Sequence, residues 1–505
     1  MSAGKDAIRI ADVLVLEDYL LLGAVVGLPW AFGGVETWAH RTAALLLAAA
    51  AAAAVVKRGW DALGLGRRSR WLLPALLLGL WAAVQLVPLP GAVLRRVSPQ
   101  AHALYAATFP GYAGPVEGSV PAAIEARALE RVPEAKVVAE PDRPQIPFDP
   151  RVGGRFGGWR AISLHPAAGL ERVFWYFALF LGFLVARRRV ADPDVAEAYH
   201  KVLFVLFFLL ASFGLLYAAT SNGKLYWVRD TLYRATPFGP YVNPTNFAAV
   251  MELAVPWLAG YTVLAWKRNA PSSPFRESRV PFLAAATATS LLAALATASK
   301  AGAALVLLSL AVLAFSVARD WRQRLAAAAG LAVLATAFAA ALYALPLGDR
   351  IRELVEATGG QVSEVDRVVA WRASAGMARD YPVTGVGFGA LPDAFGAYLP
   401  AGESKRWEHM HNDYLEVALE GGAVALALLP WLAWGFWRRA WSGAGIGLAG
   451  GSNPAAVGLL LGLLALSVHA FLDFNHQIPA NALLFTTAGA VAVARGERSV
   501  GERTP

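Results

Sequence analysis

Residues 409–437 read HMHNDYLEVALEGGAVALALLPWLAWGFW, a polar cluster that runs directly into an apolar stretch. An apolar run of about 20 residues is long enough to cross the hydrocarbon core of a bilayer as one helix. Titratable side chains at the mouth of such a helix are costly and commonly mark a functional site. The stretch therefore predicts a membrane helix over 413–437 with a candidate site at its polar end.

The whole chain shares this apolar character. Of its 505 residues, 57% are hydrophobic and only 16% are charged, which excludes an ordinary soluble domain. We expect an all-α, polytopic membrane helix bundle of about twelve transmembrane helices. The predicted spans lie near 14–34, 40–56, 71–89, 168–186, 199–219, 244–266, 280–298, 301–318, 325–346, 413–437, 453–471 and 477–495.

Basic residues cluster in the gaps that follow alternate apolar runs, as at Lys57-Arg58, Arg187 to Arg189 and Arg438-Arg439. Because Lys and Arg favour the cytoplasmic side of a membrane, these clusters predict that both termini are cytoplasmic. Topology thus accounts for the net charge of +9 without nucleic acid as a partner. The same charges favour a hairpin over one long helix across 283–318, with Lys300 at its outer turn.

Two long polar segments then lie outside the membrane. The first, 90–167, is rich in Pro and Gly and predicts an irregular loop with a short amphipathic helix near 122–131. The second is a large periplasmic loop before helix 10; its helical pattern passes Trp371 and is broken by Pro382 and the glycines that follow. The chain divides into helices 1–3, the first loop, helices 4–9, the second loop, and helices 10–12 with a cytoplasmic tail, over 1–89, 90–167, 168–346, 347–412 and 413–505.

His411 is the residue of the polar cluster best suited to chemistry, because an imidazole can accept a proton near neutral pH. Asn412 or Asp413 is a candidate cap for the helix that follows. Glu416 and Glu420, four residues apart, share a helical face with Asn412 and suit orientation of the imidazole or binding of a sugar hydroxyl. The alternative is that His411 is only a polar residue at a membrane surface.

Cations on the outer side also need an explanation, since Lys and Arg favour the cytoplasmic side. If several converge on one cleft, they would bind a pyrophosphate, because Arg offers a two-pronged donor and Lys a point charge. The alternative is ordinary solvated charge. For Lys224 and Arg229 this alternative explains the residues as well as a binding role does, and Arg229 can pair with a nearby acid. The predicted outer cations are Lys224, Arg229, Arg234, Lys300, Arg367 and Arg372.

Further polar residues lie near the predicted outer face. Pro240 and Pro244 suit the entry of the sixth helix, which Asn243 or Thr245 would cap. The N-terminus of this helix would favour an anion such as phosphate. Glu252, inside that helix, either lines a cavity or pairs with another helix. Asp473 lies at the outer mouth of the eleventh run and shares the outer face with His411.

Several kinds of chemistry find no support in the sequence. The chain contains no Cys, so it has no disulfide and no thiolate metal site. His409 and His411 have a possible metal spacing, but no further ligands converge nearby, and no metal is expected. No nucleotide-binding glycine loop is present. A substrate that carries its own activated bond therefore fits better than a cofactor or nucleotide.

Taken together, these features resemble the bacterial O-antigen ligase superfamily, which also contains polysaccharide polymerases. The resemblance covers most of the chain, and its most specific part is His411 and Gly422 with ten residues between them. It is supported by the loop stretch from Tyr381 to Gly387, the helix entry from Phe238 to Asn246, and Asp473-Phe474-Asn475.

The resemblance implies a metal-independent, inverting type-C glycosyltransferase of the bacterial inner membrane, without a cofactor. Such enzymes transfer a glycan from undecaprenyl pyrophosphate to an acceptor hydroxyl at the periplasmic face. His411 matches the family's essential histidine, a proposed general base, and Arg234 resembles its essential arginine, which would hold the pyrophosphate. Lys300 stands where the family usually has Arg, so the charge is kept but the two-pronged donor is lost.

Three functions follow as hypotheses. The first is an O-antigen ligase that transfers a finished polysaccharide to lipid A–core. The second is a polymerase of the same superfamily that extends a lipid-linked O-antigen or exopolysaccharide. Protein O-glycosylation is a variant that uses the same logic. The third, from a different class, is a transporter or flippase, which the span count allows but the polar cluster at the outer rim disfavours.

Overall fold

The computed structural model describes residues 10–109, 112, 158–231, 237–268, 274–318, 364–400, 406–445 and 453–501, with scattered positions between 320 and 336. Within these ranges the chain is mostly helical. The longer helices are α2 (Leu16–Trp30), α3 (Thr37–Arg58), α4 (Leu73–Val84), α6 (Pro99–Thr108), α8 (Pro166–Arg189), α9 (Pro193–Thr220), α10 (Pro244–Arg268), α11 (Pro274–Ala296), α12 (Lys300–Val317), α15 (Glu364–Asp380), α17 (Asp413–Ala444), α18 (Pro454–His469) and α19 (Pro479–Gly501).

The remaining elements are short. They are the α-helices α1 (Ile10–Val13), α5 (Gly91–Val97) and α16 (Leu391–Ala394), the 3₁₀ turns η1 (Phe32–Gly34), η2 (Trp60–Leu63), η3 (Arg67–Leu72), η5 (Phe395–Tyr398) and η6 (Asn475–Gln477), and the strands β1 (Leu89–Pro90) and β2 (Trp159–Arg160). The two strands pair antiparallel and join the beginning of the first outer segment to its end. Seven of the longer helices begin at a proline, whose fixed φ and missing N–H suit the first helical position, namely α6, α8, α9, α10, α11, α18 and α19.

Helices occupy eleven of the twelve predicted apolar runs, and the run at 325–346 lies mostly outside the described residues. Seven described helices are long and apolar enough to cross a membrane, namely α3, α8, α9, α10, α12, α17 and the Arg279–Ala296 part of α11. The multi-pass helical fold is therefore confirmed, whereas the count of twelve remains a prediction. The hairpin expected at Lys300 is present, because α11 ends at Ala296 and α12 begins at Lys300.

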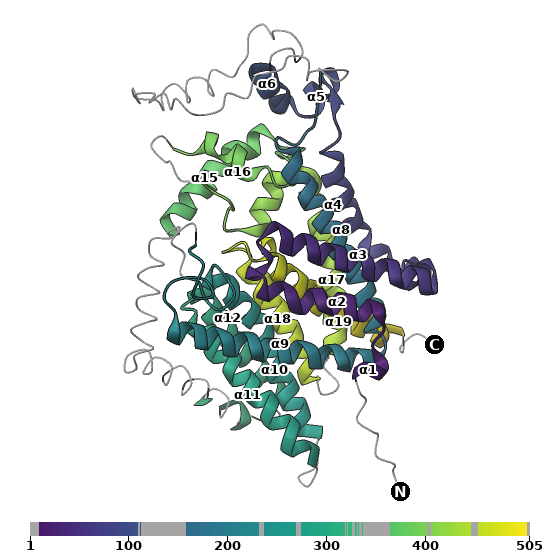
Figure 1. The fold of residues 1–505 in the computed structure, drawn as a ribbon, viewed down its shortest axis with the longest axis vertical. Helices are drawn as coiled ribbons and strands as arrows, with labels where there is room; N and C mark the ends of the chain where they lie inside the picture. Colours follow the sequence, from purple (N-terminus) through teal and green to yellow (C-terminus); the bar gives the residue numbers. More distant parts are fainter. Residues whose placement is uncertain are drawn as a thin grey trace.

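The outer segments are more regular than the sequence predicted. Residues 91–108 form α5 and α6, so the prediction of an irregular loop is wrong for this part, and residues 122–131 lie outside the described residues. In the second segment α15 ends at Asp380, just before Pro382 and the following glycines, as predicted. Figure 1 shows α5 and α6 at one end of the long axis and α11 at the other.

The centre of the bundle is the pair α10 and α18, which pack at backbone contact. A Cβ added to Gly458 would lie 2.0 Å from the Pro256 carbonyl oxygen, and one on Gly462 would lie 2.5 Å from that of Leu253. Glycines let two membrane helices approach this closely. The close packing fixes the C-terminal end of α18, and the residues that follow it, against the start of α10.

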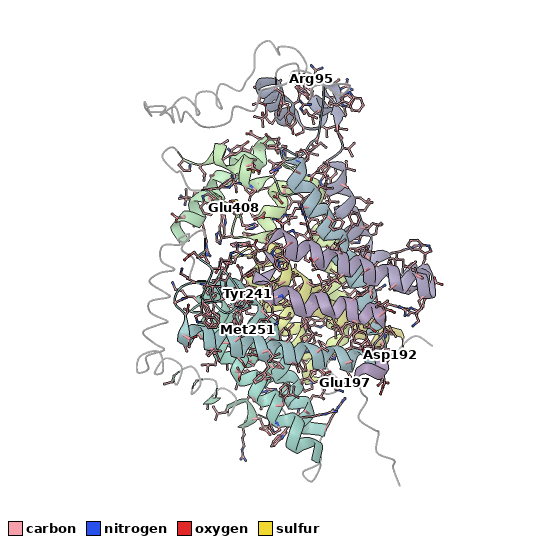
Figure 2. All side chains as sticks on the ribbon, viewed as in Figure 1. Arg95, Asp192, Glu197, Tyr241, Met251 and Glu408 are labelled. Atoms are coloured by element: carbon pink, nitrogen blue, oxygen red, sulfur yellow. The ribbon has the colours of Figure 1, made fainter. Side chains whose placement is uncertain are left out.

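A second buried cluster joins the two outer segments into one unit, here called the cap, which comprises α5, α6, α15, α16 and the chain from 381 to 410. Leu94 and Tyr105 of the first segment share this cluster with Phe395 and Met410 of the second. Figure 2 labels Arg95 at the far end of the cap, and Met251 within the bundle, where its side chain is fully buried. Apolar burial therefore holds the cap over the polar cluster at 409–416.

Candidate active site

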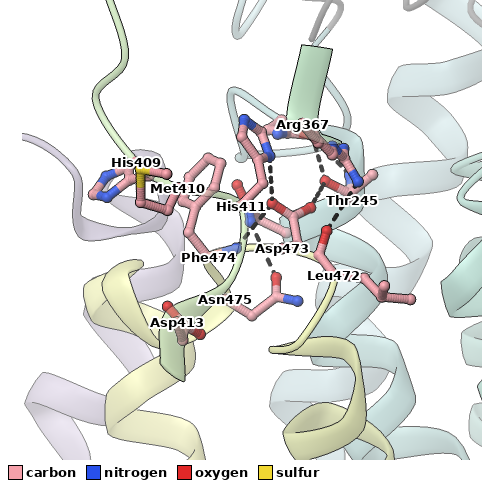
Figure 3. A network of polar contacts seen from close by, with 12 residues as sticks. Thr245, Arg367, His409, Met410, His411, Asp413, Leu472, Asp473, Phe474 and Asn475 are labelled. Carbon is pink, nitrogen blue, oxygen red and sulfur yellow. Dashed lines mark hydrogen bonds and ion pairs between the residues drawn. The ribbon is translucent and has the colours of Figure 1, made fainter. Parts of the chain in front are cut away.

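His411 pairs with Asp473, which lies 62 residues further along the chain (Figure 3). The imidazole Nδ1 and the carboxylate Oδ1 are 3.1 Å apart. An ionised carboxylate only accepts hydrogen bonds, so Nδ1 carries the hydrogen and Nε2 is unprotonated in the neutral ring. The His411 side chain is 14% exposed and that of Asp473 only 2%. The contact engages Nδ1 of His411, and the ring stays partly exposed.

The Asp473 carboxylate has a full set of donors. Besides His411, it accepts hydrogen bonds from the Thr245 hydroxyl at 2.6 Å and from the Phe474 backbone N–H at 2.9 Å. Burial alone would raise the pKa of Asp473, but the hydrogen bond and charge of His411, the charge of His469 and the Thr245 hydroxyl together hold this pKa well below its usual range. Asp473 therefore stays ionised and fixes the tautomer and orientation of His411.

The backbone around His411 is held from both sides. The Met410 N–H donates to Glu416 Oε2 at 3.0 Å, and the Met410 carbonyl accepts from Trp371 Nε1 of α15 at 2.7 Å. His411 itself has a φ of 49°, a left-handed conformation that is costly for a residue other than glycine. These contacts supply the support that such a conformation needs.

One aromatic ring lies between the two histidines of the motif. Phe474 stacks on His409 with ring centres 4.5 Å apart, and it meets His411 edge-on at 4.8 Å. His409 also contacts Glu416 at 2.9 Å. Phe474 thereby limits the ring positions that His411 can take, a role that its place beside Asp473 in the sequence did not reveal.

Glu416 and Glu420 do not contact His411, so the prediction that they orient this imidazole is wrong. Glu416 serves His409 and Met410, and Glu420 Oε1 accepts from the backbone N–H groups of Gly389 at 2.8 Å and Leu391 at 3.3 Å. Both carboxylates are buried and committed to the protein's own groups. They anchor the second outer segment to α17 and are not placed to bind a sugar.

Gly422 explains why the motif ends in glycine. It interrupts α17 with a φ of 63°, and a Cβ there would lie 2.3 Å from the Val383 carbonyl oxygen. The chain at Pro382 reaches the break, where the Ala423 N–H donates to the Pro382 carbonyl at 2.9 Å. The short helical segment 413–421 therefore begins next to His411 and ends at the break at Gly422, where Pro382 of the second outer segment contacts α17.

Of the cap residues left open by the sequence, the structure selects Asn412 over Asp413 and Asn243 over Thr245. Asn412 accepts the Leu415 N–H at 3.0 Å and begins α17, and Asn243 accepts the Thr245 N–H at 2.9 Å and begins α10. Thr245 therefore links the start of α10 to Asp473, because its hydroxyl lies within hydrogen-bond distance of both Asn243 and Asp473.

The structure brings one predicted cation close to the pair. Arg367 of α15 donates from Nη1 to the Leu472 carbonyl at 2.9 Å, next to Asp473. Lys300 is exposed at the first residue of α12, and Arg372 is exposed on α15. Arg234 lies outside the described residues.

Two other predicted outer cations have acidic partners. Arg229 lies 2.6 Å from Glu36, and Lys224 lies 3.2 Å from Asp230. The alternative of ordinary paired charge therefore holds for Arg229, as it does for Lys224.

Glu252 pairs with His469 at 2.7 Å inside the bundle, where the two side chains are 0% and 3% exposed. Of the two readings left open by the sequence, the interhelical partner is confirmed. His469 was missed, because a single histidine in an apolar run carries no signal of its partner. Within the described residues, no group of three or more His, Asp and Glu side chains is arranged to hold a metal ion.

Two comparisons relate the chain to known proteins. No curated protein matches the chain. Residues 285–430 match the family model described as O-antigen ligase, a range that includes His411, Gly422 and the α11–α12 hairpin but not Asp473. This match supports the O-antigen ligase superfamily as the family of the chain.

Proposed function

We propose that this chain is a membrane glycosyltransferase that moves a glycan from undecaprenyl pyrophosphate to an acceptor hydroxyl at the periplasmic face of the bacterial inner membrane. The proposed activity is that of an O-antigen ligase with lipid A–core as the acceptor. The observation that carries the proposal is the His411–Asp473 pair, which leaves one imidazole nitrogen free at the rim of a membrane bundle. The match to the O-antigen ligase family supports the substrate class.

In the proposed reaction, Nε2 of His411 takes the proton of the acceptor hydroxyl as its oxygen attacks the anomeric carbon of the donor glycan. A new carbon–oxygen bond forms while the bond from the anomeric carbon to the pyrophosphate oxygen breaks. The products are the glycosylated acceptor and undecaprenyl pyrophosphate, and the proton on His411 passes to solvent. A single displacement of this kind inverts the anomeric centre.

Asp473 keeps His411 productive in both protonation states. Before the step it fixes the tautomer with Nε2 unprotonated, and after the step its negative charge stabilises the imidazolium. The donor supplies the driving force through its own activated bond, so the proposal needs neither a nucleotide nor a resident metal or cofactor.

Negative charge grows on the pyrophosphate as it leaves, and fixed cations stabilise it. Arg367, beside Leu472, is the cation that the structure describes next to the pair. We assign the same role to Arg234, Lys300 and Arg372 as part of the proposal. Arg234→Ala is expected to abolish transfer, since Arg234 matches the family's essential arginine.

The decisive experiment mixes the purified protein in detergent with a defined undecaprenyl-pyrophosphate glycan and lipid A–core, and identifies the products by mass spectrometry. Glycosylated lipid A–core without a gradient supports the ligase, whereas elongated lipid-linked glycan identifies a polymerase. His411→Ala should abolish transfer, and His165→Ala, which removes an imidazole paired with Asp393 elsewhere on the cap, is the matched control. Full turnover by folded His411→Ala would refute the proposed role of His411.

A further inference from the structure

The break in α17 at Gly422 exposes backbone carbonyls that a continuous helix would pair internally. Carbonyls released in this way inside a membrane protein must find other donors. The carbonyls of Leu419, Glu420 and Gly421 do so. Leu419 O accepts from the Val386 N–H at 3.0 Å, and Glu420 O accepts from the Gly387 N–H at 3.0 Å.

The remaining donors come from α4 and the residue that follows it, more than 300 residues away in sequence. Trp81 Nε1 donates to the Gly421 carbonyl at 2.9 Å. Gln85 donates from one amide nitrogen to two carbonyls, that of Glu420 at 2.9 Å and that of Thr384 at 2.7 Å. Its amide oxygen accepts from the Phe388 N–H at 3.2 Å, so the buried Gln85 side chain uses both its donors and its acceptor.

On the basis of this geometry and resting on the function proposed above, we infer that Gln85 and Trp81 are positioning residues for transfer. They lock the helical segment 413–421 and the chain at 384–388 to one another at the helix break. The segment 413–421 carries Glu416, which holds Met410, the residue before His411. Neither Gln85 nor Trp81 touches His411, and both lie outside the range that matches the family model.

The inference explains why a polar side chain is buried at the end of an apolar helix. Gln85 is fully buried, although α4 presents Leu77, Leu80 and Val84 on an exposed face typical of lipid contact. A buried amide is retained at such a place only where its hydrogen bonds are satisfied. Here the bonds join the helix break to the chain at 384–388, in addition to the backbone hydrogen bonds of Val386 and Gly387.

The main test is Gln85→Met, which keeps the side-chain volume and removes all three hydrogen bonds. We expect kcat for transfer to fall about 10- to 100-fold with KM for the lipid donor within about threefold, because His411 is misplaced while the donor site persists. Trp81→Phe, which removes one donor, should lower kcat less. Gln100→Met, on α6 of the cap, is the matched control and should behave like the wild type.

Hydrogen exchange measured by mass spectrometry tests whether the helix break is held in place, and it does not depend on transfer activity. In Gln85→Met the backbone N–H groups of 384–391 should exchange faster, while those of α10 and α18 keep their protection. Unchanged exchange at 384–391 would overturn the inference, and so would faster exchange throughout the bundle, which indicates global destabilisation. If the wild-type protein shows no transfer, the proposed function fails, and the exchange result still decides whether Gln85 fixes the break.

Discussion

Two carboxylate–imidazole pairs flank the outer end of α18, and they differ in what can reach them. His469 and Glu252 are 2.7 Å apart and almost fully buried between α18 and α10. His411 and Asp473 are 3.1 Å apart, and His411 is 14% exposed beside the cap. The same two functional groups therefore form an internal link between helices in one place and a partly exposed pair in the other. Burial, rather than residue type, separates the two roles.

The largest effect should come from removing the reachable imidazole. His411→Ala should lower the rate of transfer about 10³-fold, the usual contribution of a positioned general base, while the protein still inserts and remains folded. Initial rates with a defined lipid donor and thermal unfolding in detergent measure the two properties. Normal turnover by the folded variant would show that His411 is not the general base.

The buried pair should respond in the opposite way, through stability. Glu252→Leu or His469→Leu alone should destabilise the protein by about 3 kcal/mol, because each leaves a buried polar partner uncompensated. The double variant should cost less than the sum of the two single variants. Thermal unfolding in detergent gives these values, and additive losses would show that the two side chains do not act as a pair.

A smaller effect should follow from altering the partner of the base. Asp473→Asn keeps the shape of the side chain but can donate a hydrogen bond to Nδ1, which moves the imidazole hydrogen to Nε2. We expect kcat to fall about 100-fold with little change in KM for the donor. A change confined to KM would instead place Asp473 in donor binding.

The smallest effect concerns stability at acid pH. The pKa of Asp473 is lowered in the folded protein, so this carboxylate contributes stability that is fully present above its unfolded pKa of about 3.9. The contribution is lost as the pH falls from there toward the folded pKa, because the unfolded state then binds the extra proton. The difference in thermal stability between wild type and Asp473→Asn should therefore shrink below about pH 4. A difference that is constant across this range would contradict the assigned ion pair.

Much of the architecture could be read from local patterns. Apolar runs predicted helices that the structure contains, the charge on either side of 283–318 predicted a hairpin at Lys300, and Pro382 with its glycines predicted the end of α15. The prediction failed for 91–108, where α5 and α6 form, because their stability comes from packing against the second outer segment. Such long-range packing leaves little periodic signal in ten residues.

Some residues of the candidate site could likewise be predicted from sequence, and others could not. Asn412 and Asn243 were predicted as helix caps and accept the expected backbone N–H groups, and His411, predicted as the candidate base, pairs with Asp473. The roles of Glu416 and Glu420 were predicted wrongly, since helical spacing places two side chains on one face without saying what that face meets. Gln85 and His469 were not predicted at all, because their partners lie 335 and 217 residues away.

The amino-acid sequence by itself determined that this chain is a helical membrane protein, where most of its apolar helices lie, and that Asn412 and Asn243 begin two of them. Those properties depend on apolar length, charge and local capping, which act between neighbours in the chain. Only the tertiary structure decided that Asp473 is the partner of His411, that Glu416 is not, and that α4 closes the break at Gly422. Hydrogen bonds and burial act through space, and spacing along the chain does not encode them.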